Sequence, residues 1–285
     1  MTQRLTKKDQ SVMPSVRSHF ARQSVQWSDR YCAEPRGMAD LDLALRRECV
    51  HRMLWPMISQ SIGTVVILDV GCGTGDVLDG LPRDLVSVIG IDCTPEMAAR
   101  AQALHPGDAF LAAEASALPF SPESSDIVIS LGTLEYLREP EGALAAIHRT
   151  LRNGGSLVVS VPNRRSIFRR LLGIERTLEH ALHQTLGRNA RGAVAKSHDA
   201  PLPFHRRWSV GEACQLIVDA GFEIERTRLH TMGPWGRIGR MRAILRLSRF
   251  ASNGLGGRPG IAGWLANTIV IQARKHNTVT RSQKA

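Results

Sequence analysis

Residues 69–76 read Asp69-Val70-Gly71-Cys72-Gly73-Thr74-Gly75-Asp76 and follow directly on an apolar, β-branched run. Alternate glycines permit a tight turn with positive φ and let a ligand lie against the backbone, where any side chain would block it. Such a turn is a weak signal alone, but Asp92 stands seventeen residues beyond Gly75, at the end of the next β-branched run. A carboxylate placed there can accept hydrogen bonds from both hydroxyls of a ribose. Together the two features predict a nucleoside-binding turn between a strand and a helix.

Short β-branched runs alternate with helical stretches around this turn, as expected when crossover helices connect parallel strands. We therefore predict an α/β fold with a doubly wound, seven-stranded, mostly parallel sheet. The predicted strands are Thr64–Val70, Val86–Ile91, Ala109–Ala113, Asp126–Leu131, Ser156–Val161, Phe222–Leu229 and Asn267–Ala273. The predicted helices are Asp76–Gly80, Thr94–Ala103, Glu141–Leu151, which ends at a C-cap and turn formed by Asn153-Gly154-Gly155, and Ser209–Ala220.

Two segments, 162–208 and 230–265, fit no element of this sheet and are predicted to be insertions. If the first six strands are parallel, both insertions leave from carboxyl ends of strands, the edge where open α/β sheets bind ligands. Residues 15–60 are amphipathic and predict helices that pack on the sheet or close over a site. We expect an N-terminal helical cap over residues 1–60 and a cofactor-binding domain over residues 61–285 that carries both insertions.

The composition suits a folded protein of a reducing compartment. The chain has 285 residues, of which 43% are hydrophobic and 22% charged, so a full core is possible. Its five cysteines are widely spaced without a C-x-x-C pair, which supports neither a disulfide framework nor a zinc site. No apolar run approaches the ~20 residues that span a bilayer, and the polar N-terminus leads into no signal core. We expect a cytoplasmic protein, with peripheral contact at the inner face of a membrane as an option.

The charges near the turn indicate which nucleoside is bound. A dinucleotide would place its pyrophosphate at the helix N-terminus, where Asp76 and Asp69 would repel it. S-adenosylmethionine has no phosphate, and its ammonium and sulfonium groups are both positive. Glu114 follows the third predicted strand, where an acid can take the adenine amino group while the backbone N–H of Ala115 reaches a ring nitrogen. We therefore predict S-adenosyl-L-methionine as the cofactor.

These residues resemble the class I S-adenosylmethionine-dependent methyltransferases, in particular the branch with the ubiquinone and menaquinone biosynthesis enzymes. The resemblance runs from Val66 to Asn163 and more weakly through His205–Glu225. It is carried by VILDVGCGTGDVL (66–78), VIGIDCTPEMAARA (88–101), AEASALPFSPESSDIVISLGTLEYL (113–137) and LRNGGSLVVSVPN (151–163). The resemblance implies that the seventh strand is antiparallel. It also implies that the methionine part is held by Asp69, Gly71, Gly73 and Gly75, with Cys72 in the same turn, and the ribose by Asp92 and Cys93. In the same way it implies that Met97 lies near the adenine and that Glu114, Ala115 and Leu131 complete the pocket.

The segment after the fourth predicted strand bears on the acceptor. The Asn/Asp-Pro-Pro-Tyr motif of methylases that act on exocyclic amines in DNA is absent, and nucleic acid is not an expected acceptor. Ubiquinone O-methyltransferases have Glu-x-x-Glu-His here, which looks like a metal site, but this chain has Gly132 and Tyr136 at the first and last positions. Glu135 alone makes a poor metal site, so no metal is predicted.

A hydroxyl acceptor must lose its proton as the methyl group moves, and histidine is the commonest base. His205 ends the first insertion and is the candidate base, although a structural hydrogen bond or a surface role is the commoner use of such a histidine. Tyr136 either orients the acceptor or only packs against neighbouring side chains.

The second half of the chain is strongly basic. Residues 164–285 contain 22 Lys and Arg against 7 Asp and Glu. Arginines alternate with apolar side chains in both insertions, a composition typical of a basic amphipathic helix at an anionic membrane interface. A solvated arginine face is the alternative, and RNA binding is less supported because no aromatic stacking platform is present.

We expect a methyltransferase acting on a small hydrophobic or lipid-like acceptor, most plausibly at a hydroxyl oxygen. The alternatives are a C-methyltransferase, a methylase of a sugar or phosphorylated metabolite, or, from another class, a basic RNA-binding or membrane-adaptor protein with a relict cofactor fold. The oligomeric state is left open by the sequence.

Overall fold

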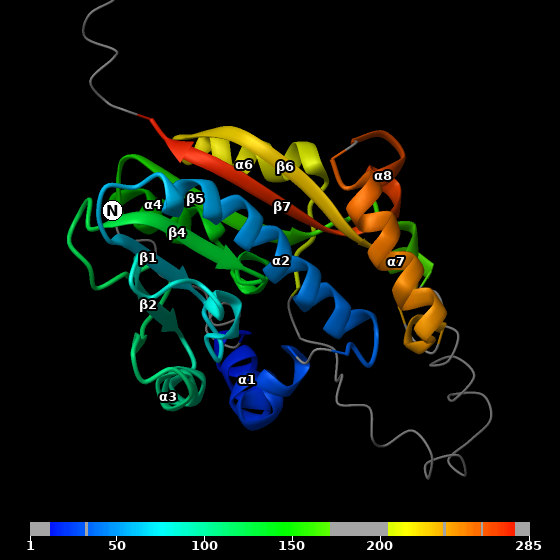
Figure 1. Ribbon diagram of the computed structural model, residues 1–285, viewed down its shortest axis with the longest axis horizontal. Coiled ribbons are helices and arrows are strands. Elements are labelled where there is room, and N and C mark those ends of the chain that lie inside the picture. The colour runs from blue at the N-terminus through cyan, green and yellow to red at the C-terminus, as the bar shows by residue number, and fades with distance from the viewer. Residues whose placement is uncertain (1–11, 32–33, 172–204, 236–237, 258, 277–285) are drawn as a thin grey trace, which may run out of the picture.

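The computed structural model describes residues 12–31, 34–171, 205–235, 238–257 and 259–276. Its centre is a seven-stranded sheet with the order β3-β2-β1-β4-β5-β7-β6 (Figure 1). The five strands of the first half are β1 (Val65–Val70), β2 (Val86–Asp92), β3 (Ala109–Ala112), β4 (Ser125–Leu131) and β5 (Leu151–Pro162). They are followed by β6 (Phe222–Met232) and β7 (Ala266–Lys275). Because β7 is antiparallel to both β5 and β6, the first six strands run in one direction. The predicted fold class and antiparallel last strand are confirmed.

Helices cover both faces of the sheet. One face packs on α2 (Met38–Ser59), whose Val50, Leu54 and Ile58 join a core with Ile67 of β1. The opposite face packs on α4 (Pro140–Thr150) and α6 (Val210–Asp219). The neighbouring β1 residue, Leu68, belongs to this second core, as the alternation of side chains along a strand requires. Both faces are therefore buried, which explains the nearly continuous apolar runs of the central strands.

The remaining elements surround the carboxyl edge and the β6 end of the sheet. The helix α1 (Val12–Trp27) contacts α3 (Pro95–Leu104), while α7 (Arg242–Leu255) and α8 (Pro259–Leu265) pack along β6. Four short 3₁₀ helices, Ser28–Tyr31, Asp76–Leu78, Leu134–Tyr136 and Ile238–Arg240, complete the described part. None of the helices described combines the length and the apolar character that crossing a bilayer requires.

Two local predictions were wrong. The helix predicted at Asp76–Gly80 is a single 3₁₀ turn over Asp76–Leu78, because left-handed glycines on both sides, Gly75 and Gly80, leave no room for a longer helix. The stretch Asn153-Gly154-Gly155 is not a helix C-cap: α4 ends at Thr150, and the stretch belongs to β5. Gly154 has a φ of 75° and the β4–β5 register shifts nearby, so these glycines serve an irregularity within the strand.

The C-terminal elements follow the prediction more closely. Ser209 caps α6 through a full capping box with Glu212, as the spacing of the two residues predicts. The predicted second insertion is shorter than expected, since β6 continues to Met232 before α7 and α8 begin. Most of the first insertion, residues 172–204, lies outside the described residues. The division into a cap over 1–60 and a domain over 61–285 remains a prediction.

Candidate functional site

A cavity of about 290 Å³ opens at the carboxyl edge of the sheet. Its walls come from the ends of β1, β2 and β4, from α1 and α2, and from Pro162, Arg169 and His205. Twelve of the thirteen residues predicted to form the site line it, namely Asp69, Gly71, Cys72, Gly73, Asp92, Cys93, Met97, Glu114, Ala115, Leu131, Tyr136 and His205. The fold therefore gathers segments that are up to 136 residues apart in sequence around one space, at the edge where this sheet class binds ligands.

The glycine turn lies under α1. Gly71 and Gly73 have positive φ, and a Cβ on Gly73 would lie 3.3 Å from Nε1 of Trp27. A side chain at this position would press into the space between the turn and the helix. Gly75 faces away from the cavity, where its missing Cβ leaves room for His105 and Phe110. Its role in this structure is close packing of the turn against α3 and β3.

Asp69 is the most deeply buried acid of the turn. Its side chain lies at the end of β1, is only 3% exposed, and its Oδ2 atom has no hydrogen-bond partner among the described residues. Burial, and secondarily the charge of Asp92, raises the pKa of Asp69 to about 8. A buried carboxylate oxygen without a donor is unfavourable unless a ligand supplies one. The site is thus built to accept a cationic donor at Asp69.

Asp92 connects the turn to the next strand. One of its oxygens accepts the N–H of Gly73 at 3.0 Å, and the other accepts the N–H of Thr94 at 2.8 Å. Burial raises the pKa of Asp92, while these two hydrogen bonds oppose that rise. The Thr94 side chain also hydrogen-bonds to Asp92, but a carboxylate has about four acceptor sites, so the side chain can still accept a hydrogen bond from a ligand. Asp92 is therefore a structural anchor of the turn as well as a candidate ribose ligand.

The end of the cavity that Glu114 lines holds a contact that the sequence did not indicate. Glu114 lines the cavity, but in this structure it forms an ion pair with Arg17 of α1. Met97 and Ala115 are buried nearby in the same wall, at 1% and 8% exposure. A ligand that used Glu114 would share it with Arg17 or displace the guanidinium. The helix α1 is thus part of the site and more than a cover for it.

Aromatic rings line the opposite end of the cavity. Tyr136 contacts the His205 ring edge to face at 5.4 Å and the Phe20 ring at 5.2 Å, and Phe20 in turn contacts Trp27. Burial, with Arg169 and Arg207, lowers the pKa of His205 to about 4, so this imidazole is neutral at pH 7. Burial raises the pKa of Tyr136. A flat, mainly apolar group would find ring contacts on this side.

Glu135 is the second proton acceptor at this end. Its side chain is 4% exposed, lines the cavity, and leaves Oε2 without a hydrogen-bond partner among the described residues. Burial raises the pKa of Glu135 to about 7, although the nearby Arg46 lowers it. Sequence analysis weighed this residue only as a metal ligand. The signal for another role was its place directly after a buried strand that ends at the ligand-binding edge.

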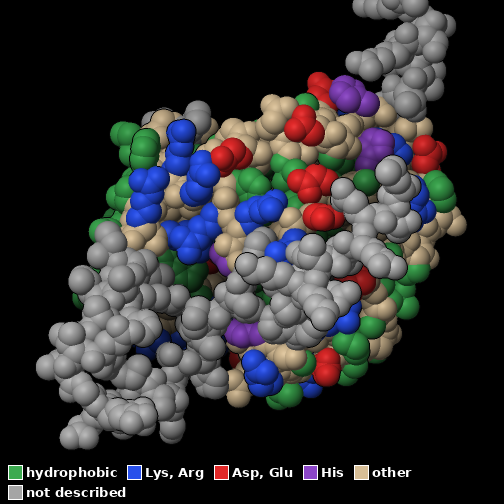
Figure 2. All heavy atoms as spheres, turned by 180° about the vertical axis from the view of Figure 1, so that it is seen from behind, with side chains coloured by type: hydrophobic (Ala, Val, Ile, Leu, Met, Phe, Trp, Pro, Cys, Tyr) green, Lys and Arg blue, Asp and Glu red, His purple; other side chains and the backbone are tan. Residues whose placement is uncertain are grey.

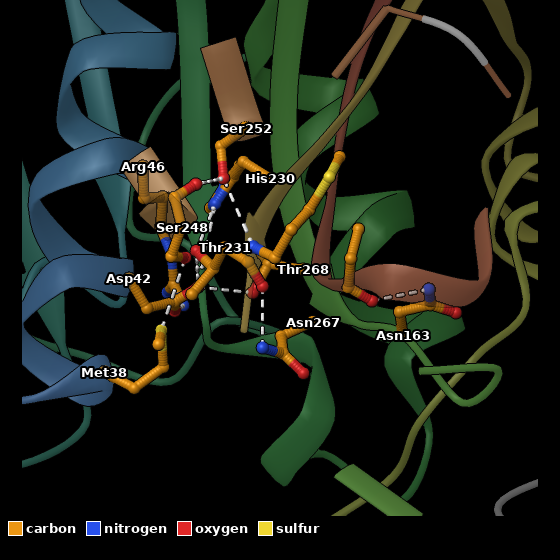
Figure 3. A network of polar contacts seen from close by, with 12 residues as sticks. Met38, Asp42, Arg46, Asn163, His230, Thr231, Ser248, Ser252, Asn267 and Thr268 are labelled. Carbon is orange, nitrogen blue, oxygen red and sulfur yellow. Dashed lines mark hydrogen bonds and ion pairs between the residues drawn. The ribbon is translucent and has the colours of Figure 1, made fainter. Parts of the chain in front are cut away.

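A buried polar network that joins α2, β6 and β7 adjoins the cavity (Figure 3). Asp42 of α2 pairs with Arg46 at 2.6 Å and accepts hydrogen bonds from the hydroxyls of Thr231 and Thr268, each at 2.6 Å. Both Asp42 and Arg46 line the cavity. The sequence does not indicate this pair, because its partners on β6 and β7 lie 189 and 226 residues from Asp42.

Outside the cavity, the described residues contain one cluster of possible metal ligands, Asp76, Asp79 and His105, whose candidate atoms lie within 4.8 Å of one another. Its members already bond to one another or to Thr74. The cluster therefore has internal partners and does not call for an ion.

Residues 68–159 match the protein family described as "Methyltransferase domain". Over 193 residues the chain is 26% identical to the Mycolicibacterium smegmatis protein named "Probable S-adenosylmethionine-dependent methyltransferase", which covers 67% of this chain and 63% of that protein. The match thus spans slightly less than two thirds of that relative. A "Ubiquinone biosynthesis O-methyltransferase" of Pseudomonas paraeruginosa is 32% identical over 119 residues, which is 40% of this chain and 51% of that protein.

The fold is similar to that of solved methyltransferases. The crystal structure of magnesium protoporphyrin IX methyltransferase from Synechocystis PCC 6803 with bound SAH superposes with a TM-score of 0.57 at 16% identity, covering 91% of this chain and 97% of that one. At this identity the likeness concerns the fold alone.

Proposed function

The chain belongs to the class I S-adenosylmethionine-dependent methyltransferases, and from this premise we propose that it methylates a hydroxyl oxygen of a small hydrophobic or lipid-like acceptor. One observation carries the proposal. A single cavity joins the glycine turn and Asp69 to an aromatic end that holds Tyr136, His205 and Glu135. A donor and an acceptor bound in one enclosed space can be aligned, and alignment is the main contribution that a protein makes to such a transfer.

The cofactor half of the cavity fits S-adenosylmethionine by charge. Asp69 offers its unpartnered carboxylate oxygen to a cation, and Asp92 retains free lone pairs beside the glycine turn. Gly71 and Gly73 let a ligand approach the backbone closely. When bound, S-adenosylmethionine supplies an electrophilic methyl group. The chain's own acids and glycines hold and orient it.

The acceptor half offers two bases for the hydroxyl proton. His205 is neutral at pH 7 and can accept a proton, but its pKa of about 4 makes it a weak base. Glu135, with a pKa of about 7, is matched more closely to the pH at which a cytoplasmic enzyme works. We therefore assign the proton to Glu135 and keep His205 and Tyr136 as groups that contact and orient the acceptor.

We also propose that a basic and apolar face beside the cavity docks on anionic membranes. On α7 and α8 the side chains of Leu247, Phe250, Ile261 and Trp264 are 63%, 78%, 74% and 48% exposed. The guanidinium groups of Arg165 and Arg170 lie over the Trp264 ring at 5.7 and 5.9 Å. Figure 2 shows basic side chains gathered beside hydrophobic ones on the side of the molecule where α7 and α8 lie.

Charge favours a bilayer as the partner of this face. Residues 226–285 contain no Asp or Glu, and an anionic leaflet attracts arginines while it accepts apolar side chains. The face also adjoins the cavity, since Arg169 lines the cavity and its neighbour Arg170 reaches Trp264. A hydrophobic acceptor could pass between bilayer and cavity at this place.

Vesicle flotation tests the docking face. We expect the protein to float with phosphatidylcholine vesicles that contain phosphatidylglycerol, to float less as salt rises, and not to float with phosphatidylcholine alone. Replacing Leu247 and Phe250 with Ser should abolish flotation, whereas Val218→Ser, an exposed apolar position on α6, should leave it unchanged. Absence of binding at low salt, or equal binding by the double variant, rules the face out.

Methyl transfer to a metabolite extract tests the proposed activity. The protein is incubated with the extract and methyl-labelled S-adenosylmethionine, and the labelled product is identified by mass spectrometry. We expect a methyl ether of an apolar molecule. A product methylated at carbon, or a methylated sugar or phosphorylated metabolite, would contradict the proposal of an apolar hydroxyl acceptor. A labelled protein or RNA would contradict the proposal of a small-molecule acceptor.

A further inference from the structure

Arg169 holds a fixed position on the wall of the acceptor half of the cavity. It lies in a short helical segment, residues 167–171, and its backbone N–H donates to Oγ of Ser166. Its Nε donates to the backbone carbonyl of Asn267 at 3.0 Å, and its guanidinium lies over the Trp235 ring at 4.8 Å. Both Arg169 and Trp235 line the cavity. The guanidinium is therefore oriented from two sides before any ligand arrives.

The support for Arg169 is itself rigid. The Asn267 side-chain amide donates to the carbonyls of Thr231 and Gly233 at 2.6 and 2.9 Å, and its Oδ1 accepts the Ser166 hydroxyl at 2.7 Å. Asn267 is completely buried. Three hydrogen bonds of its side chain thus hold Asn267, whose backbone carbonyl accepts the hydrogen bond from Arg169 Nε.

Among the described residues, no carboxylate forms an ion pair with Arg169. The nearby Asp42 is engaged by Arg46, Thr231 and Thr268, so its oxygens are already used. Glu135 lines the same cavity, but it forms no ion pair with Arg169 and its Oε2 has no hydrogen-bond donor among the described residues. Burial lowers the pKa of Arg169, while the charges of Asp42 and Glu135 raise it without forming an ion pair. A ligand carboxylate bonded to the guanidinium would therefore stabilise its charged form.

Resting on the proposed function, we propose that the acceptor carries a carboxylate and that Arg169 binds it. The planar guanidinium can form two parallel hydrogen bonds to a carboxylate through the nitrogens that Asn267 leaves free. A phosphate dianion fits less well, because its two negative charges are repelled by Glu135 in the same half of the cavity more strongly than the single charge of a carboxylate. The substrate class is thus an apolar, ring-bearing hydroxy acid rather than a neutral alcohol or phenol.

Two probes of the same shape test this assignment. The protein is saturated with S-adenosylhomocysteine, and the affinities of 2-naphthoate and its neutral isostere 2-naphthamide are measured by calorimetry. We expect 2-naphthoate to bind about tenfold more tightly, the ratio that corresponds to ~1.4 kcal/mol. Arg169→Gln should remove the preference, while Arg169→Lys should keep part of it because the charge remains but the paired hydrogen bonds do not.

The neighbouring residue supplies the control. Arg170 is exposed, stacks on Trp264 and does not line the cavity, so Arg170→Gln should preserve the preference for 2-naphthoate. The assignment is overturned if the unmodified protein binds the two probes equally well or binds neither. It is also overturned if Arg169→Gln and Arg170→Gln lower the preference for 2-naphthoate by the same factor. Failure to bind S-adenosylhomocysteine would instead contradict the proposed function. The affinities of the two probes are then compared in the absence of S-adenosylhomocysteine, so that the role of Arg169 is still tested.

Discussion

Asp42 and Arg46 lie one turn apart on α2 and form a buried ion pair, with 2.6 Å between Oδ2 and Nη2. The other oxygen of Asp42 accepts the hydroxyls of Thr231 on β6 and Thr268 on β7. The helix α2 is thereby joined to β6 and β7 by one carboxylate. Since Arg46 also lines the cavity, the acceptor side cannot be assembled without α2 in place.

Replacing Asp42 with Asn should destabilise the protein by about 3–5 kcal/mol, because Arg46 would keep its charge in a buried place without a counterion. The free energy of unfolding in urea measures the effect. The control is Arg249→Gln, which breaks the half-exposed pair between α7 and Glu48 and should cost less than about 1 kcal/mol. Similar losses in both variants would contradict a special role for Asp42.

The same pair predicts how stability depends on pH. Although burial opposes its charged form, the cations around Asp42, above all Arg46, hold its pKa below the usual range. A lowered folded-state pKa contributes stability that is complete above the unfolded pKa of about 4 and is lost as pH falls towards the folded one. We expect the stability difference between the unmodified protein and Asp42→Asn to shrink as pH falls below about 4. A difference that stays constant from pH 7 to pH 3 would refute this linkage.

Binding of S-adenosylmethionine should release a proton from Asp69. With a pKa of about 8, Asp69 is mostly protonated at pH 7, and a cation bound beside it favours the charged form. Affinity should therefore rise with pH up to about 8 and then level off. Calorimetry at pH 7 in buffers of different ionisation enthalpy should report release of nearly one proton, and Asp69→Asn should release none from this position. If both proteins release the same number of protons on binding, the proton comes from a group other than Asp69.

The pH dependence of turnover should distinguish the two bases. If Glu135 takes the hydroxyl proton, kcat should rise as pH passes about 7, since only the ionised carboxylate accepts a proton. Glu135→Gln should lower kcat by ~10²-fold and remove this rise, with S-adenosylmethionine affinity unchanged. His205→Ala should retain the rise. If the His205 variant instead loses ~10²-fold and the Glu135 variant does not, the base is His205, as the sequence alone suggested.

The sheet, and the half of the cavity lined by the glycine turn, Asp92 and Glu114, could be predicted from the sequence. The strand pattern and the glycine turn depend on local periodicity and on backbone conformation, and both are encoded in short windows such as residues 64–76. The positions of Asp92 and Glu114 followed because parallel strands end at one edge. Each of these inferences needed only residues that are close in sequence.

The other half depends on contacts between distant segments. Nothing near Arg46 in sequence indicates that Thr231 and Thr268 share its partner Asp42, and nothing near Glu114 indicates Arg17. The elevated pKa of Glu135 arises from burial, which the sequence does not specify for a single glutamate after a strand. Gly75 shows the converse: its place in the motif implied a ligand contact, whereas its neighbours His105 and Phe110 show a packing role.

Titration of the protein with S-adenosylmethionine by calorimetry tests the central claim most directly. The account predicts one binding site per chain, a loss of about 2–3 kcal/mol for Asp92→Ala through its ribose hydrogen bonds, and no measurable binding for Gly73→Val, whose side chain would fill the space beside Trp27. Circular dichroism would verify that both variants are folded. Absence of binding to the unmodified protein, or equal affinity in all three proteins, would contradict a cofactor site at the glycine turn.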